Sequence, residues 1–240
     1  VPSSSGAARV EWLRPRELLD GRMAAVDSVK SAVLVEPDAH AVWGGDGDSG
    51  DASGRGGWFA SALAVLAQSP KLLARCFVPG DHAKRGIVAV RIWCWHEWRT
   101  VLTDDRLPLV NGKLLCGGVA DVAQLTFALL LKAYAKHYGS YAALRKGRVA
   151  EFLTDLTGGV SQKLELGGEE SRAWAELSAL KAAGALLSCQ QAALASRSAA
   201  EPFADGIRLR STYVILSQVV LSSGERLLCL RNPWATPLWR

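Results

Sequence analysis

Cysteine is scarce in this sequence, and the few cysteines do not form pairs. The five, Cys76, Cys94, Cys116, Cys189 and Cys229, lie far apart and never as Cys-x-x-Cys. An odd number of widely spaced cysteines argues against a disulfide framework and against a zinc site. We therefore expect a protein of a reducing compartment that holds no cofactor, with each cysteine acting as a small buried apolar residue.

Long apolar runs and a strong charge imbalance are also missing. The apolar runs are far shorter than a bilayer span, and the opening "VPSSSGAARVEW" lacks the basic-then-apolar order of a secretory signal. The net charge of +5 is mild and is spread over both halves of the chain. These features predict a cytoplasmic, soluble protein with neither a membrane nor nucleic acid as its partner.

The glycine-rich stretch 44–57 contains three fragments of ligand-binding motifs, and each is incomplete. Gly45, Gly47 and Gly50 have dinucleotide-loop spacing, but no strand leads into them and aspartates lie between them. The start of a calcium loop reaches Gly57 where a glutamate is required. "GDSG" (47–50) has too little chain before it for the histidine and aspartate of a trypsin-like protease. We interpret the stretch as a loop.

The remaining pattern predicts an α+β protein with two lobes. A helical stripe covers 58–68, two strands flank a His96-Glu97 turn, a turn is expected at Asn111-Gly112, and a long apolar helix covers 122–138. After the paired glycines at 158–159 come strand-like "SQKLELGG", a helix near 170–183 and two final strands around Ser222-Ser223-Gly224. We expect a helical first lobe over 1–159 and an antiparallel, β-rich second lobe over 160–240.

Several longer runs, in this order, carry a family resemblance. They are "WLRPREL" (12–18), "GGWFASALAVLAQSPKLLARCFVP" (56–79), "WHEWRTVLTDDRLPLVNGKLL" (95–115), "ALLLKAYAKHYGSYAAL" (128–144), "EFLTDLTGG" (151–159), "STYVIL" (211–216) and "LCLRNPW" (228–234). With them the chain resembles the protease core of calpains, cytosolic cysteine proteases of the papain-like superfamily. The resemblance implies a two-lobed papain-like fold. It also implies that the second lobe is truncated and that other domains of a longer parent chain follow.

The same resemblance places the family's catalytic residues on this sequence. The family writes Gly-Asp-Cys-Trp, preceded by an oxyanion-binding Gln, then Gly-His-Ala-Tyr and Arg-Asn-Pro-Trp. Registered on Trp58 and Tyr213, the cysteine corresponds to Gly57, the histidine to Ser211 and the glutamine to Asp51, and Asn232 is retained. Glycine offers no nucleophile, and serine is no base near neutral pH. We therefore expect a chain that is not an enzyme, with Trp58 and Trp234 remaining to line a binding cleft.

The family's calcium switch also looks altered. The resemblance places calcium ligands at Asp48, which is retained, and at Gln124, where the family has a glutamate. The loop "LSQVVLSSG" (216–224) has no acid where the family's second-lobe loop is acidic. Calcium prefers several charged oxygens, so we expect no metal site. In the scaffold, Asp104 and Asp105 are expected to be buried beside Arg106 and paired, fixing a loop.

These features together favour a structural or protein-binding role. Calpain-like proteins without the triad are associated with the cytoskeleton, notably with microtubules in flagellated protists, so the resemblance implies a cytoskeletal or axonemal location. Basic residues on one turn, Arg145, Lys146 and Arg148, would suit an acidic protein surface such as tubulin, although a solvated loop explains them equally well. The alternatives are a calpain-type calcium-dependent endopeptidase that uses a displaced nucleophile, and a decoy that regulates such a protease.

Overall fold

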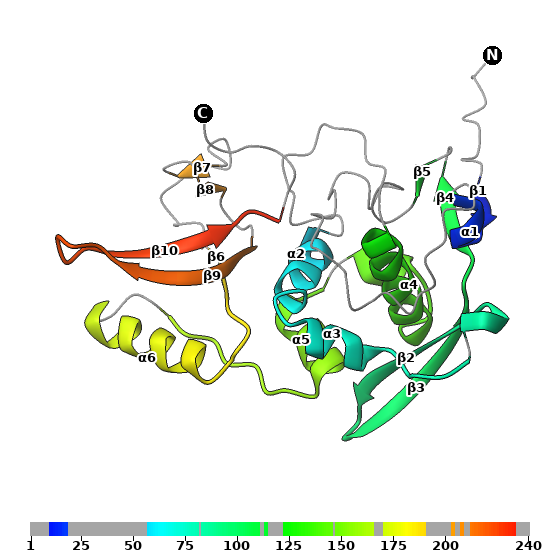
Figure 1. Ribbon diagram of the computed structural model, residues 1–240, viewed down its shortest axis with the longest axis horizontal. Helices are drawn as coiled ribbons and strands as arrows, with labels where there is room; N and C mark the ends of the chain where they lie inside the picture. Colours follow the sequence, from blue (N-terminus) through cyan, green and yellow to red (C-terminus); the bar gives the residue numbers. More distant parts are fainter. Residues whose placement is uncertain are drawn as a thin grey trace, which may run out of the picture.

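The computed structural model describes residues 10–18, 57–81, 83–110, 113–114, 122–145, 147–165, 170–190, 203–204, 207–208 and 212–233 (Figure 1). The first half contains α1 (Pro15–Leu18), α2 (Gly57–Leu66), α3 (Pro70–Cys76), α4 (Val122–His137) and α5 (Val149–Thr157), with short 3-10 turns η2 (Ala83–Arg85) and η3 (Ala142–Arg145). Its strands are β1 (Val10–Leu13), β2 (Ile87–Cys94), β3 (Glu97–Asp104), β4 (Leu107–Val110) and β5 (Lys113–Leu114). Runs of helices and runs of antiparallel strands are segregated here, which confirms the α+β class.

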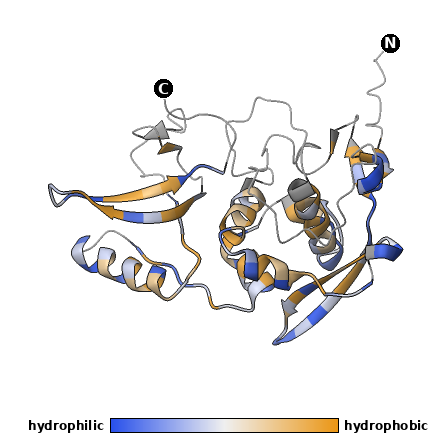
Figure 2. Cartoon of the chain, in the orientation of Figure 1, coloured by the Kyte–Doolittle hydropathy of each residue, from blue (hydrophilic) through white to orange (hydrophobic). Residues whose placement is uncertain are grey.

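Helix α2 forms the centre of the first half. The expected stripe of Phe59, Ala62, Leu63 and Leu66 is buried, but so is every other residue from 58 to 67. A helix that is apolar all round is stable only inside a core. Side chains from α2, α4, α5 and β2 accordingly form one hydrophobic cluster, and Figure 2 shows hydrophobic residues along these elements. Helix α3 follows directly, with Ser69 as its N-cap and Pro70 in its first turn.

Strands β2 and β3 form a hairpin whose turn differs from the prediction. The register runs from Ile87↔Asp104 to Cys94↔Glu97, so the two turn residues are Trp95 and His96, and Glu97 already belongs to β3. Both turn residues have positive φ, 52° and 65°. Such primed turns match the twist of the paired strands, which is why the ladder extends one residue further than expected. In the separate β1-β4-β5 sheet, Val110 pairs with Lys113, and the predicted turn at Asn111-Gly112 lies outside the described residues.

The second half contains α6 (Glu170–Ala182), β6 (Ser188–Gln190), β7 (Phe203–Ala204), β8 (Ile207–Arg208), β9 (Thr212–Val220) and β10 (Arg226–Arg231). The sheet order is β10-β9-β6, with a bulge at Cys229/Leu230, and α6 lies along this sheet (Figure 1). The final hairpin and the helix near 170–183 are confirmed. Strand-like "SQKLELGG" is wrong for its described part, because 161–165 forms no strand.

The two halves meet where β9 packs against α2 and α5. Val65 and Val214 are fully buried there, in a small cluster that also includes Ala64 and the partly buried Leu153 and Leu216. This contact brings the first residues of β9 next to the helix that begins at Gly57. The division into lobes at residue 159 remains a prediction.

Candidate functional site

The candidate site begins at the N-terminus of α2, where Gly57 is the first helical residue. The next residue, Trp58, is 9% exposed, and its indole N–H donates a hydrogen bond of 3.0 Å to the carbonyl oxygen of Leu144. The ring also makes edge contacts with Phe59 and Phe152, at centroid distances of 5.6 and 6.2 Å. Trp58 therefore anchors the start of the helix to the first-half core instead of standing open in a cleft.

A glycine in the next loop makes this packing possible. A Cβ atom on Gly147 would overlap the six-membered ring of Trp58, so only glycine allows the backbone this close to the indole. Sequence analysis did not identify Gly147, because its role depends on a residue 89 positions earlier that only the fold brings near. Gly147 thus positions the helix that carries Gly57.

The second half of the chain contributes the start of β9 and the end of β10 to the candidate site. Arg231 pairs with Val214, so the next residue along β10, Asn232, comes beside Tyr213 at the same end of the ladder. At that end the Ser61 hydroxyl of α2 donates a hydrogen bond of 3.2 Å to the carbonyl oxygen of Thr212. The structure therefore brings α2 next to the start of β9, and the site residues that the resemblance implied remain a prediction. Ser61 was not foreseen.

Several predicted site residues lie outside the described residues: Asp48, Asp51, Lys146, Ser211 and Trp234. Gln124 belongs to the first turn of α4, and Arg145 ends η3. Arg148 is the N-cap residue of α5; its side chain is 81% exposed and pairs with Glu151 at 3.4 Å. Among the residues that the structure describes, no three acidic, histidine or cysteine side chains gather to hold a metal ion. The question of calcium at Asp48 therefore remains a prediction.

The described thiols bear on whether another cysteine could replace the missing nucleophile. Burial raises the pKa of Cys76 to about 12, and its Sγ donates to the carbonyl oxygens of Leu72 and Leu156. Burial also raises the pKa of Cys189 to about 11. Both thiols are neutral near pH 7, and a neutral thiol is a poor nucleophile. The prediction that every cysteine is buried is wrong for Cys229, which is exposed because it lies on the outward face of β10.

Three of the runs that carried the resemblance meet in one charged network. Arg14 pairs with Asp105 at 2.5 Å, and Lys132 pairs with Asp104 at 2.6 Å while also donating to the Arg106 carbonyl oxygen. Burial opposes ionisation of Asp104, but the hydrogen bond from Lys132 and the nearby charges lower its pKa overall. The expected pairing is confirmed, with Lys132 and Arg14 as partners. The expected burial is wrong for Asp104, whose side chain is 59% exposed at the end of β3.

A second network joins α4 to α5. The hydroxyls of Tyr134 and Tyr138 both donate to the same carboxylate oxygen of Asp155, each at 2.7 Å. Burial, together with these bonds to Asp155, raises the pKa of both tyrosines, for Tyr138 to about 12. Tyr134 also packs against Phe152 and Phe59. This network fixes the two helices that hold α2 in place.

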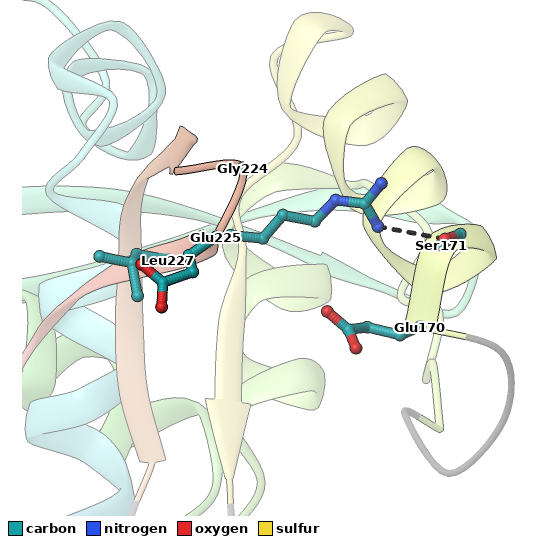
Figure 3. Close-up of a pocket in the computed structure, with 6 residues that line it drawn as sticks. Glu170, Ser171, Gly224, Glu225 and Leu227 are labelled. Atoms are coloured by element: carbon teal, nitrogen blue, oxygen red, sulfur yellow. Dashed lines mark hydrogen bonds between the residues drawn. The ribbon is translucent and has the colours of Figure 1, made fainter. Parts of the chain in front are cut away.

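An open pocket lies elsewhere, where α6 begins beside the β9–β10 turn. Figure 3 shows Glu170 and Ser171 facing Glu225 and its neighbours, with the Arg226 guanidinium donating to the Ser171 hydroxyl at 3.3 Å. Its two carboxylates are partly offset by one guanidinium, and it shares no lining residue with the α2 site. We do not regard it as part of the candidate site. No described helix combines the length and apolar character that crossing a membrane requires.

Comparison with known proteins identifies the class that this fold and site define. The family model described as "Calpain family cysteine protease" matches residues 2–240. The chain therefore belongs to the calpain family of cysteine proteases, as the sequence resemblance predicted.

The relatives are calpains from animals and plants. The chain is 31% identical over 245 residues to the calpain-2 catalytic subunit of Bos taurus, covering 99% of this chain and 33% of the relative. The chain is also 31% identical to calpain-12 of Homo sapiens, and the match covers 99% of this chain and 31% of that relative. The chain is 33% identical to the calpain-type cysteine protease DEK1 of Arabidopsis thaliana, and the match covers 94% of this chain and 10% of that relative. The chain thus spans about a third of the animal relatives' length and a tenth of the plant protein's.

Proposed function

We propose that this chain is a proteolytically inactive calpain-family module that works by binding other proteins. The observation that carries the proposal is Gly57 at the first position of α2. The family resemblance puts the nucleophilic cysteine there, where a helix N-terminus would stabilise a thiolate. A glycine leaves the helix terminus intact and removes the reacting atom. Loss of one triad member typically lowers the rate by several orders of magnitude.

The surroundings of Gly57 support a retained scaffold. Trp58, Gly147 and the Tyr134–Asp155 network hold α2 in a well-packed core. The two thiols with raised pKa values, Cys76 and Cys189, offer no thiolate near neutral pH. A calpain-like frame without a nucleophile is suited to binding proteins, since binding surfaces need no chemistry.

The test is labelling with a peptidyl epoxide that alkylates the active cysteine of papain-like proteases, with casein cleavage in calcium measured alongside. We expect no labelling and no cleavage by the native chain. The matched control is Gly57→Cys, which adds a thiol at the helix terminus and should gain one site of labelling by a plain haloacetamide over the native chain, whose exposed Cys229 is labelled in both. Calcium-dependent cleavage by the native chain, or epoxide labelling at a single cysteine, would establish the alternative of an active endopeptidase.

The partner class that we propose is a cytoskeletal protein, with microtubules as the first candidate and the cytoplasm or an axoneme as the location. The net charge of +5 and the exposed Arg148 suit an acidic surface such as that of tubulin. Co-sedimentation with microtubules across a salt series tests this, and we expect pelleting that weakens as salt rises. No pelleting, together with binding of a calpain-inhibitor peptide, would instead support a decoy.

A further inference from the structure

The tip of the β2–β3 hairpin presents a tryptophan in an unfavourable backbone conformation. Trp95 and His96 occupy the two turn positions with φ of 52° and 65°, where asparagine and glycine are the usual residues. Non-glycine residues in this region are strained, and they are concentrated at functional sites. The Trp95 side chain is also 81% exposed, and Figure 1 shows the hairpin projecting from the lower edge of the molecule. Packing within the chain therefore does not explain why a tryptophan occupies this turn position.

Behind the tip lies a half-buried aromatic pair. Trp93 and Trp98 are directly cross-strand partners, with ring centroids 5.4 Å apart in an edge-to-face arrangement. The Arg91 guanidinium lies over the Trp98 ring, 4.8 Å from its centroid. The end of α5 also touches this ring, because a Cβ atom on Gly158 would come within 2.9 Å of it. These contacts hold the two rings in a fixed arrangement beneath Trp95.

Positive charge borders this aromatic pair. Phe77, directly after α3, forms an antiparallel bridge with Val90 of β2, which brings the last turn of α3 with its exposed Arg75 beside Arg91. Neither arginine takes part in an ion pair with any residue in the described ranges, whereas Arg99 on the other face of β3 is neutralised by Glu97 at 2.8 Å. The local excess is therefore cationic.

We infer that this region docks an acidic segment of a protein partner. The hairpin surface, as we call it, consists of Arg75, Arg91, Trp93, Trp95 and Trp98. Tryptophan and arginine are the residues that most often dominate protein–protein binding energy, and two uncompensated guanidinium groups fit carboxylates. The inference rests on the proposed protein-binding function and adds the surface and the partner's chemistry.

The experiment measures the fluorescence anisotropy of a fluorescein-labelled peptide of Glu-Glu-Gly repeats as the purified chain is added. We expect saturable binding that weakens with salt. Trp95→Ala should weaken it about tenfold, and Arg75→Gln about threefold. The matched control, Arg172→Gln, removes an exposed arginine of α6 outside the hairpin surface and should leave binding unchanged. A second variant, Thr100→Glu, adds a carboxylate opposite Arg91 on the same face and should weaken binding without deleting any contact.

Two results would overturn the inference. One is unchanged peptide binding by Trp95→Ala and Thr100→Glu, with circular dichroism confirming that both are folded. The other is binding to phosphatidylserine vesicles or to poly-uridine RNA that depends on Trp95 when the peptide does not bind. Failure here is distinct from failure of the proposed function, because epoxide labelling of the native chain does not involve the hairpin surface, and microtubule pelleting reports binding through any surface of the chain.

Discussion

The two halves of the molecule are packed very differently. In the first half, one cluster joins α2, α4, α5 and β2, and its largest side chains, such as Phe59 and Phe152, are almost completely inaccessible. In the second half, the cluster between α6 and the sheet contains three buried residues. Four apolar side chains at the far end of the β9–β10 hairpin are 40–58% exposed: Val219, Val220, Leu221 and Leu227. Packing is therefore concentrated around the helix that begins at Gly57.

This contrast bears on why the chain retains the calpain-family fold around α2. A helix whose every residue from 58 to 67 is buried would be retained for stability even without a catalytic role at its N-terminus. Glycine at position 57 leaves the buried residues 58–67 in place, whereas a change at Trp58 would disrupt the core. Stability and catalysis are therefore separable at adjacent positions.

The largest loss of stability should come from a substitution in the well-packed first half. Trp58→Ala removes a buried indole and its bond to Leu144, and we expect a loss of about 3–5 kcal/mol of unfolding free energy in urea. Trp95→Ala is the matched control, because that side chain is 81% exposed and should change stability by less than about 0.5 kcal/mol. Similar losses for both would mean that the hairpin tip is part of the core after all.

Two glycines that each follow a helix allow the two halves to be compared, because both have a similar positive φ. Gly158 after α5 has φ of 69°, and Gly184 after α6 has φ of 79°. Alanine at either position adds backbone strain of about 1 kcal/mol. At Gly158 the new Cβ must also displace Trp98, so we expect a total of about 3 kcal/mol there, while nothing lies within 4 Å at Gly184. Thermal denaturation of both variants checks this. Equal losses would show that Trp98 moves aside without cost.

The sequence predicted most of the frame because the frame is built from local patterns. Helix α2, helix α4 and the final hairpin follow from apolar spacing and turn residues, and the expected pairing of Asp104 and Asp105 was confirmed. The long-range partners could not be predicted: the fit of Gly147 under Trp58, the bond from Ser61 to Thr212, and the choice of Lys132 and Arg14 as counter-ions. None of these leaves a periodic signal, because each joins segments that only the fold brings together.

The junction between the halves is the next test. Val214→Ala removes two carbon atoms from the fully buried contact with Val65, and we expect a loss of about 2 kcal/mol. The control Val219→Ala, on the same strand but 43% exposed, should cost less than about 0.5 kcal/mol. Limited proteolysis of the segment 160–165 reports separately on the junction, since faster cleavage in Val214→Ala alone would show that the halves have loosened.

The smallest effect concerns Tyr138 and depends on pH. Tyr138→Phe removes one of the two hydroxyls on Asp155 at a half-exposed site, and should cost less than about 1 kcal/mol at pH 7. In the folded native chain the pKa of Tyr138 is raised from 10.0 to about 12. The folded state thus holds this proton more tightly, so the stabilisation is complete below pH 10 and disappears as pH rises towards 12. Native chain and variant should therefore differ in urea midpoint at pH 8 and converge at high pH. A difference that instead widened above pH 10 would mean that the Tyr138 proton is not held by Asp155.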